Sequence, residues 1–465
     1  MTLPIKGLRQ NKKRSRTRSL SGILPVALYV RPFSCGGRCI FCPSVKGVPN
    51  SYISNEDTLL AKRLEFDPAL QFRAWVNSLP QHLLRPGLPH EVIILGGSFS
   101  ALSDSYRRNF VNGLYREMEV HRSDDTKHGA RCSVLTIESR PDQITESECR
   151  FLREIGVSKV EIGVQHTSDV VLETIGRGHT QIDVTRATRL LKENGFKVGY
   201  HVMVGLPGAS MRDDCEMLGE SLWQPEYHPD YLKVYPCVLL KDRSAQPALT
   251  KLYEEGQWRP PSELHCETTL TALAQSIPSH VRLSRIQRQF DSRQCIDAPK
   301  PGVRNRIATT LSDLRAKEVG LLSTESITIS QLLCELTRSG NDLFFQVKLN
   351  SYGWLLAIAR VSIYEDACAV LREIKVFGSA ASVGERGQVQ GKGLGSGLLN
   401  AIEQFLARTG CKTIKTNAAV GARSFFFQYG YVSDHEYFLC KDLQNRSISD
   451  CIKTANSIEL EFVAI

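Results

Sequence analysis

Three cysteines stand within eight residues near the start of the chain, at Cys35, Cys39 and Cys42 in the segment Cys-Gly-Gly-Arg-Cys-Ile-Phe-Cys. Thiolates are soft ligands that suit iron, and three of them can hold a [4Fe-4S] cluster whose fourth iron stays open. A structural zinc site normally has four protein ligands, and no second Cys or His pair stands nearby to complete one. Three unrelated buried cysteines are a weaker explanation, because glycines and a strand-like segment accompany the group. The spacing therefore predicts an iron–sulfur cluster with an open position.

A second segment suited to chemistry is the glycine-rich stretch at residues 388–397. Its candidate ligands are Gln390, Gly391, Gly393, Gly395 and Ser396. Free N–H groups at the start of a helix attract an anionic pyrophosphate, and glycines let it come close. The stretch resembles the pyrophosphate loop of GNAT acetyltransferases, which implies acetyl-CoA. A dinucleotide fingerprint has similar glycine spacing, but the strands ahead of it are not a βαβ unit. A flexible linker is a minor alternative.

The elements that position the cysteines alternate between strand and helix character. Strand-like segments are found at residues 23–29, 92–95, 134–137, 160–164, 198–204 and 231–235, with helical stretches at 58–79, 142–155 and 182–194. Such alternation is typical of the α/β class, and about six repeats predict a partial βα (TIM-like) barrel. Functional loops then lie at the C-terminal ends of the strands, and the cysteine segment follows the first of them.

The pattern changes near residue 320. Residues 343–349, 355–363 and 371–376 are consecutive strand-like segments, followed by the glycine-rich stretch, a helix at 396–408, a strand at 412–417, another helix and a final strand pair. We expect a basic arm at residues 1–20, a barrel domain at 21–320 and an α+β GNAT domain at 321–465. A chain of 465 residues is long enough for two cores.

The composition is that of a globular protein of the cytoplasm. Apolar residues make up 42% and charged residues 23% of the chain, and no apolar run approaches the roughly 18 residues of a membrane span. We therefore expect no membrane contact. The 14 cysteines form no disulfide framework and no signal-peptide pattern precedes them, which fits a reducing compartment.

The N-terminal arm is strongly basic, and the first acidic residue of the chain is Glu56. The candidate RNA-binding residues of the arm are Lys12, Lys13, Arg14 and Arg16. Basic arms bind phosphate backbones by releasing counterions. A solvated tail and an organelle transit peptide are the alternatives, although apolar residues are missing between positions 10 and 19. We favour contact with nucleic acid.

The cysteine spacing matches the radical S-adenosylmethionine (SAM) superfamily, in which the open iron binds SAM and its reductive cleavage yields a carbon radical. Gly96 and Gly97, after an apolar segment, resemble the glycine-rich strand end that receives the SAM amino group in that superfamily. Missing side chains permit such an approach, although a tight turn explains two glycines equally well.

Four further segments narrow the resemblance. They are Thr-Ile-Glu-Ser-Arg-Pro-Asp at 136–142, Val-Glu-Ile-Gly-Val-Gln at 160–165, Arg-Gly-His-Thr at 177–180 and Lys-Val-Tyr-Pro at 233–236. Together they resemble the catalytic subunit of Elongator over about residues 18–431. The resemblance implies a radical SAM domain joined to a GNAT domain. It also implies transfer of an acetyl-CoA-derived carboxymethyl group to carbon 5 of the wobble uridine of tRNA.

The resemblance also implies roles for single residues. Glu138, Glu161 and Gln165 would bind the SAM ribose and adenine, although each carboxylate could equally pair with an arginine. Lys233 and Tyr235 would face the reaction chamber. Both are candidates for catalysis, and Lys233 is also a candidate for cofactor binding. The remaining candidates are Glu373 and Tyr429 for catalysis and Arg285 and Arg288 for RNA phosphates, with a solvated charged strand as the alternative for the arginines.

The chain departs from the Elongator pattern in its last helix. Phe425 and Phe426 stand where a tyrosine pair is usual, and phenylalanine cannot protonate a departing CoA thiolate. Tyr429 or Tyr431 can replace the missing hydroxyl. The alternatives are that water or another residue serves, or that this domain binds acetyl-CoA without efficient turnover.

The resemblance implies tRNA as the substrate, and Elongator-like subunits or a second copy of the chain as protein partners. Two other functions stay open. One is a protein lysine acetyltransferase with a structural cluster, which the missing tyrosines disfavour. The other is a non-catalytic tRNA-binding relative, which the complete cysteine triad disfavours.

Overall fold

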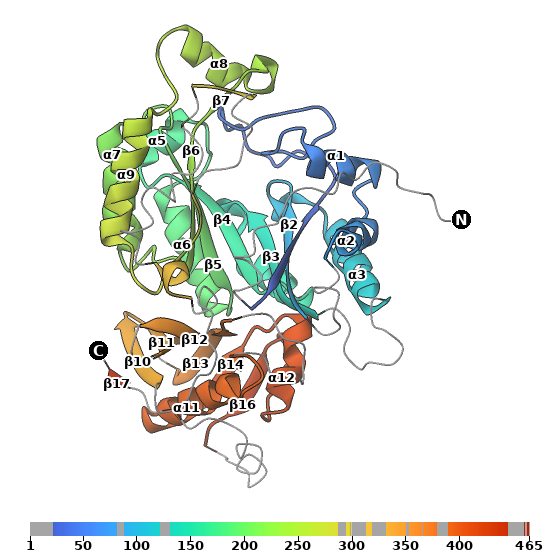
Figure 1. Ribbon diagram of the computed structural model, residues 1–465, viewed down its shortest axis with the longest axis vertical. Coiled ribbons are helices and arrows are strands. Elements are labelled where there is room, and N and C mark those ends of the chain that lie inside the picture. The colour runs from blue at the N-terminus through green and yellow to red at the C-terminus, as the bar shows by residue number, and fades with distance from the viewer. Residues whose placement is uncertain are drawn as a thin grey trace.

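The described residues form two large β-sheets with their helices and a small sheet of β7 (Leu239–Leu240) and β9 (Cys295–Ile296). Figure 1 shows one large sheet above the other. The computed structural model describes residues 22–80, 88–120, 131–286, 294–297, 299, 313–318, 332–349, 353–364, 366–378, 389–444, 460 and 463–464. Within these residues, none of the helices is long and apolar enough to cross a membrane.

Within the described part of the chain, the first sheet has seven strands that lie in the order of the sequence, and every neighbouring pair is parallel. The strands are β1 (Leu24–Tyr29), β2 (Pro89–Leu95), β3 (Arg131–Ser139), β4 (Lys159–Gln165), β5 (Lys197–Val204), β6 (Tyr231–Pro236) and β8 (Arg282–Ile286). Among the described residues, β1 and β8 do not pair, so the barrel is incomplete. The predicted partial βα barrel is confirmed.

Helices connect and cover these strands. They are α1 (Glu56–Arg63), α2 (Pro68–Asn77), α3 (Asp104–Val120), α4 (Glu146–Glu154), α5 (Asp169–Thr174), α6 (Gln181–Glu193), α7 (Met211–Gly219), α8 (Pro247–Glu254) and α9 (Glu263–Ser276). The helical stretch expected at residues 58–79 is two helices, because Glu65 and Phe66 have positive φ and Asp67 caps a new helix that starts with Pro68.

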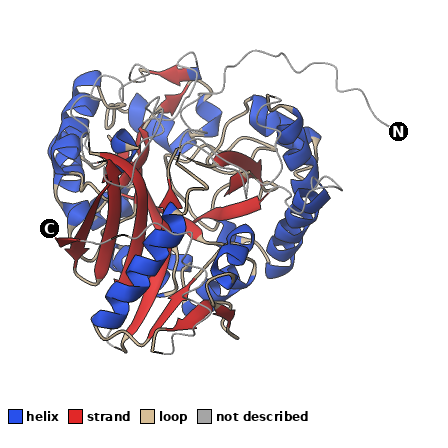
Figure 2. Cartoon of the chain, turned by 60° about the horizontal axis from the view of Figure 1, so that its bottom comes forward, coloured by secondary structure: helices blue, strands red, loops and turns tan. Residues whose placement is uncertain are grey.

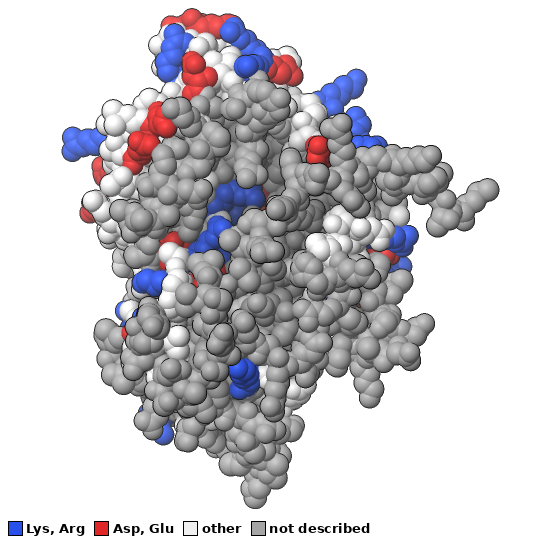
Figure 3. Space-filling model, viewed as in Figure 1, with Lys and Arg blue, Asp and Glu red and all other residues white. Residues whose placement is uncertain are grey.

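Strand β2 shows how the barrel differs on its two faces. His90, Val92 and Ile94 are buried, and the latter two join the core beneath the helices, whereas Glu91, Ile93 and Leu95 alternate with them and are only partly buried. On this strand, the side chains that face the interior of the barrel, which we call the lumen, are therefore less completely buried than those that face the helices. Basic side chains are visible in the hollow in the middle of the face that Figure 3 presents.

The second sheet, as far as the structure describes it, has eight strands in the order β15-β16-β14-β13-β12-β11-β10-β17. Their bounds are β10 (Leu332–Ser339), β11 (Asp342–Leu349), β12 (Trp354–Ile363), β13 (Cys368–Val376), β14 (Thr413–Thr416), β15 (Val432–Ser433), β16 (Leu439–Asp442) and β17 (Val463–Ala464). Helices α11 (Leu394–Arg408) and α12 (Arg423–Phe427) join its core, and α11 packs on β12 and β13 (Figure 2). Strand β10 was not expected from the sequence.

The second sheet meets the N-terminal ends of the barrel strands. Arg131, the first residue of β3, donates to Gly421 O, and Asn417 donates to Val157 O just ahead of β4. Arg360 of β12 donates to His280 O, just ahead of β8. The cysteine segment follows the opposite end of β1, and a six-residue strand spans about 20 Å at the usual rise. The two predicted cofactor sites therefore lie at opposite ends of the barrel.

A β-bulge in β13 directs two successive side chains at the barrel. The register with β12 passes from Glu373 to Leu371 and leaves Arg372 as the extra residue. Arg372 pairs with Asp230 just ahead of β6, and Glu373 accepts a hydrogen bond from Tyr231. Burial would raise the pKa of Asp230, but Arg372 and Arg360 lower it to about 2. Buried charges thus join the two sheets.

Candidate active site

The cysteine segment forms a loop in which the three thiols face a shared space. A Cβ added at Gly37 would lie 3.6 Å from the Sγ atoms of both Cys35 and Cys39. Burial raises the pKa of Cys42, a hydrogen bond with Ser51 opposes this, and the other two thiols add to the rise. The absent side chain at Gly37 leaves room between the sulfurs, and a bound cation would stabilise them as thiolates.

Two buried arginines border this space. Arg177 donates from Nη1 to Cys39 Sγ at 3.3 Å and from Nη2 to Gly163 O at 2.7 Å, and Arg140 donates to Arg177 O at 2.8 Å. Arg140 Nη1 and Arg177 Nε are buried without a hydrogen-bond partner among the described residues. Three convergent thiols beside unpaired guanidinium N–H groups fit an anionic iron–sulfur cluster. Both arginines belong to segments that carry the resemblance to Elongator, at residues 136–142 and 177–180. Nothing in the sequence indicated that their side chains would reach the cysteines.

Gly96 and Gly97 lie beside the cysteine loop at the end of β2. Their φ angles are +136° and +98°, and a Cβ at Gly96 would lie 2.6 Å from Val30 Cγ2. A Cβ at Gly97 would lie 4.0 Å from Cys35 Cβ. Both positions therefore need glycine, and they bring a side-chain-free strand end next to the thiols.

Deeper in the lumen, Glu161 of β4 is the centre of a charged cluster. Its carboxylate pairs with Lys233 of β6 and, at 3.0 Å, with Lys159, and it lies 2.8 Å from Nε2 of His201 on β5. A Cβ at Gly199 would lie 3.0 Å from Glu161 Cγ, so this glycine lets the side chain pass over β5. Burial would raise the pKa of Glu161, but Lys233 and Lys159 hold it well below its usual range.

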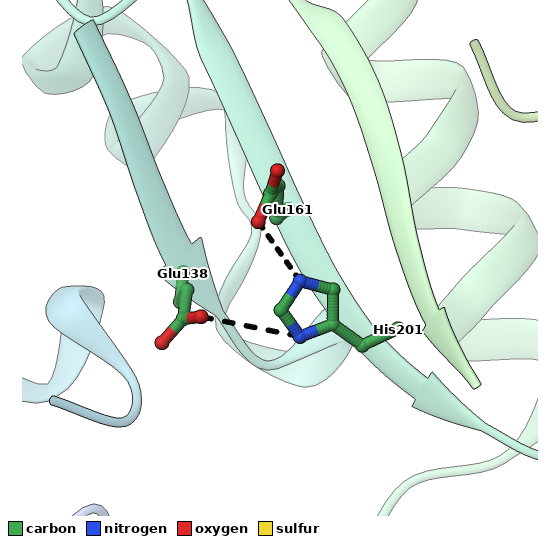
Figure 4. A group of neighbouring side chains, drawn as sticks. All are labelled: Glu138, Glu161 and His201. Carbon is green, nitrogen blue, oxygen red and sulfur yellow. Dashed lines mark hydrogen bonds and ion pairs between the residues drawn. The ribbon is translucent and has the colours of Figure 1, made fainter. Parts of the chain in front are cut away.

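The cluster continues toward both ends of the lumen. Lys159 also donates to Glu91 of β2 at 3.1 Å. Burial would raise the pKa of Glu91, but Lys159 and Lys375 of β13 lower it to about 2. On the other side, Glu138 of β3 accepts from Tyr52 and lies close to His201 and Glu161 (Figure 4). Alternating charges therefore run from the second sheet to the level of the predicted SAM residues.

The predicted residues Tyr235 and Gln165 border the same region. The Tyr235 ring meets the His201 ring edge-on, with centroids 5.8 Å apart. Gln165 has φ +67° at the end of β4, and a Cβ at Gly163 would lie 2.7 Å from its Nε2. The structure thus brings the predicted barrel residues together, and it adds Tyr52, Lys159 and His201, which the sequence did not single out.

The glycine-rich loop leads into the start of α11. Gly391 and Gly393 have φ angles of +77° and +81°, and Gly393 is the N-cap residue with no side-chain cap. The first N–H groups of such a helix are open to an anion. Tyr429 OH lies 2.5 Å from Ser396 Oγ in the first turn, and the Phe425 ring faces Gly395. These residues fit a pyrophosphate and place the Tyr429 hydroxyl beside the loop.

The side chain of Gln390 ties this loop to the barrel. Its Nε2 donates to Val376 O at 3.0 Å and to Gly22 O at 3.3 Å, just ahead of β1. A Cβ at Gly22 would lie 2.1 Å from that nitrogen. Gln390 therefore positions the loop with its side chain, so its contribution to an anion site comes from its backbone.

Glu373 lies apart from the glycine loop. Its carboxylate accepts from Tyr231 and, at 2.9 Å, from Arg360, and the residue is 8% exposed at the junction of the sheets. With both oxygens engaged by these buried groups, the placement favours a structural role over the catalytic role expected from the sequence.

Of the predicted RNA-binding residues, Arg285 is described. It lies on the edge strand β8, in register with Lys233, and is partly buried. Lys12, Lys13, Arg14, Arg16 and Arg288 lie outside the described residues.

Comparisons with known proteins agree with this architecture. The family model of the radical SAM superfamily matches residues 29–219. The chain is 31% identical to a tRNA uridine(34) acetyltransferase of Dehalococcoides mccartyi, over 93% of this chain and 100% of that protein. It is 27% identical to human Elongator complex protein 3, over 89% of this chain and 83% of that protein.

A solved structure shares the fold. It is the archaeal Methanocaldococcus infernus Elp3 with an N-terminal deletion, which is 24% identical and has a TM-score of 0.73, covering 91% of this chain and 100% of that one. The similarity extends over both sheets.

Proposed function

Because this chain belongs to the radical SAM family of tRNA uridine(34) acetyltransferases, we propose that it attaches an acetyl-CoA-derived carboxymethyl group to carbon 5 of the wobble uridine of tRNA. One observation carries the proposal. A three-thiol loop and a helix start suited to pyrophosphate lie at opposite ends of one lumen lined by charges. A reaction that uses both cofactors needs such a connection.

The thiol loop supplies the radical half of this function. Cys35, Cys39 and Cys42 would hold a [4Fe-4S] cluster, which together with SAM would supply the radical chemistry of hydrogen abstraction. Arg177 lies against Cys39, and its positive charge offsets part of the cluster's negative charge. Gly96 and Gly97 leave room for the SAM methionine, and Glu138 and Gln165 bind its nucleoside. Glu161, predicted for the same role, has both oxygens paired with Lys159 and Lys233 and instead positions the side chains of the lumen.

The glycine loop supplies the acetyl half. N–H groups at the start of α11 bind the pyrophosphate of acetyl-CoA, which directs the acetyl group toward the lumen. Tyr429, oriented by Ser396, gives a proton to the CoA sulfur when the thioester is hydrolysed, and so takes the role that Phe425 and Phe426 lack.

Lys233 and Tyr235 act where the two halves meet. Glu161 and the backbone of β6 hold the Lys233 ammonium group in the lumen, where it stabilises negative charge that develops on a carbonyl oxygen of the acetyl group or the uracil. Arg285 on the edge strand, Arg288 and the basic arm bind RNA phosphates, so tRNA affinity falls as salt rises. Elongator-like subunits or a second copy complete the assembly.

The proposal is tested with full-length protein reconstituted without oxygen and incubated with SAM, reductant, acetyl-CoA and tRNA. Mass spectrometry of the tRNA nucleosides should detect 5-carboxymethyluridine with the parent protein and none with Cys39→Ala. Cys215→Ala, which changes a cysteine on α7, is the matched control and should retain product. SAM cleavage without modified uridine, or product from Cys39→Ala, would contradict the proposal.

A further inference from the structure

A buried glutamine outside the lumen, Gln246, holds the cysteine loop from the side of α8, the helix at the top of Figure 1. Gln246 is the N-cap residue of that helix, where a short polar side chain usually bonds to the first turn. Its side chain makes no such bond, and the residue is 3% exposed. A buried carboxamide that does not cap its own helix needs partners elsewhere.

The carboxamide finds three partners, all of them backbone groups. Its Nε2 donates to Phe41 O at 2.6 Å and to Val238 O at 3.3 Å, and its Oε1 accepts from Leu240 N at 2.9 Å. Two carbonyls on one side and an N–H on the other fix which end is nitrogen and which is oxygen. The oxygen end joins β7, and the nitrogen end reaches the peptide between two of the three cysteines.

That peptide unit, between Phe41 and Cys42, is hydrogen-bonded on both sides. Its carbonyl accepts from Gln246, and its N–H donates to Cys39 O at 3.2 Å. Because a peptide unit is planar, fixing both groups fixes its orientation and the direction in which Cys42 leaves the turn. Gln246 therefore acts on the relative placement of two thiols that are predicted to bind one cluster.

The flanks of the same turn are held by backbone bonds. Ile40 N donates to Ile175 O at 3.0 Å, and Ser44 N donates to Ala245 O at 2.8 Å. These bonds anchor the loop to the segments on either side of it. They do not involve the carbonyl between them, whose direction depends on Gln246.

We propose that Gln246 is a positioning residue for the cluster, which holds the turn between Cys39 and Cys42 in the shape that lets both thiols bind iron. None of the three bonds of its carboxamide goes to a cysteine. Residues that orient metal ligands in this indirect way usually change metal affinity about tenfold to a hundredfold. The inference rests on the part of the proposed function that assigns a cluster to the three cysteines.

Two substitutions of Gln246 separate its contacts. Gln246→Met has a similar size and shape but loses all three hydrogen bonds. Gln246→Glu keeps an acceptor for Leu240 N and places a carboxylate against Phe41 O. A role confined to β7 predicts that Gln246→Glu is the milder change, whereas a role at the cysteine turn predicts that it is at least as harmful as Gln246→Met.

Gln71→Met is the matched control. Gln71 on α2 is also buried, at 6% exposed, and its carboxamide bonds the N–H and the carbonyl of Tyr29, both at 2.9 Å. Its loss removes hydrogen bonds of the same kind from strand β1 and leaves the cysteine turn intact. Thermal unfolding of each variant measures the general cost of these lost bonds.

The experiment follows cluster retention in full-length protein reconstituted without oxygen, with no SAM or tRNA added. Release of iron to bathophenanthroline disulfonate is recorded by absorbance, and the reduced cluster by electron paramagnetic resonance. Gln246→Met should release iron roughly tenfold faster than the parent. Its resonance signal should be broader, because the turn is no longer held in one arrangement. Gln71→Met should release iron at the rate of the parent.

Equal rates in parent and Gln246→Met, the same acceleration in Gln71→Met, or a milder effect of Gln246→Glu would overturn the inference. Because no product is measured, these results would leave the proposed function standing. A parent protein that takes up no iron would contradict both.

Discussion

The candidate sites at the two ends of the lumen consist of different chemical groups. At the barrel end, the site consists of side chains whose charges are buried and paired, such as Glu161 between Lys159 and Lys233. At the second sheet, the site consists of backbone N–H groups and glycines at the start of α11. The first arrangement depends on the packing of strands that are far apart in sequence, and the second on a local turn. Damage to packing should therefore affect the two ends unequally.

The largest effect is expected where the sheets join. Arg372→Met removes the partner of Asp230 and leaves that carboxylate with Arg360 at 3.5 Å, all with side chains about 3% exposed or less. Breaking a buried ion pair costs about 3–5 kcal/mol, so the free energy of unfolding should fall by that amount. Chemical denaturation measures it.

The matched control is Arg189→Met, which breaks the exposed i,i+4 pair with Glu193 on α6. Such pairs contribute about 0.3–0.5 kcal/mol, so this variant should unfold almost as the parent does. If Arg372→Met is as stable as the control, the buried charges do not hold the two sheets together.

A second effect concerns pH at the same junction. His228 and His280 lie with their Nε2 atoms 3.3 Å apart, among Asp230, Asp342, Lys192, Arg360 and Arg372. Burial lowers the pKa of His228 to about 4 and that of His280 to about 3, from 6.5. The unfolded chain binds protons near pH 6.5 and the folded chain does not, so stability falls as pH decreases from 6.5 toward 4.

At pH 5 each histidine should reduce the free energy of unfolding by about 2 kcal/mol relative to pH 7.5. His228→Asn should lose part of this dependence, and the difference from the parent isolates the junction because other buried histidines are present in both proteins. Denaturation curves between pH 7.5 and 5 provide the measurement. Parallel pH profiles for the two proteins would show that the junction does not sense protons.

The third and smallest effect is expected on acetyl-CoA binding at the glycine-rich loop. Gly22 has φ +79°, and a Cβ there would displace the Gln390 amide from its carbonyl partners. Gly22→Ala should therefore loosen the loop and raise the dissociation constant for acetyl-CoA roughly tenfold, with a modest loss of stability from the positive φ. Calorimetric titration of the full-length protein with acetyl-CoA tests this.

Gly410→Ala is the control for backbone strain, since Gly410 has φ +90° and open space around its Cα. It should cost stability in the same way but leave acetyl-CoA affinity unchanged. Equal affinities for the two variants would mean that the tie between Gln390 and Gly22 does not shape the loop.

The same contrast explains what the sequence could predict. The cysteine triad, the glycine-rich stretch and the strand alternation are local patterns, and they were sufficient for the partial barrel and for placing Gly391 and Gly393 at a helix start. Pro68, the first residue of α2, is a local signal for the break between the two helices that replace the single helical stretch expected at residues 58–79.

Long-range pairing left no such signal. Arg177 meets Cys39 across 138 positions of the sequence, and Tyr231 meets Glu373 across 142. The residue type alone does not show whether an arginine or glutamate is buried or exposed to solvent. The bulge at Arg372, which turns Glu373 toward the barrel, depends on how β13 pairs with β12 and leaves no local pattern in the sequence. His201 was missed because a single histidine inside a strand carries no spacing pattern.

In the proposed function, both ends of the lumen serve one reaction. It is tested most directly by supplying acetyl-CoA with a deuterated methyl group to reconstituted protein, SAM, reductant and tRNA, and then analysing both products by mass spectrometry. Deuterium is expected in the 5′-deoxyadenosine, and label in the modified uridine, of the same reaction. Deoxyadenosine that stays free of deuterium while labelled uridine forms would contradict it.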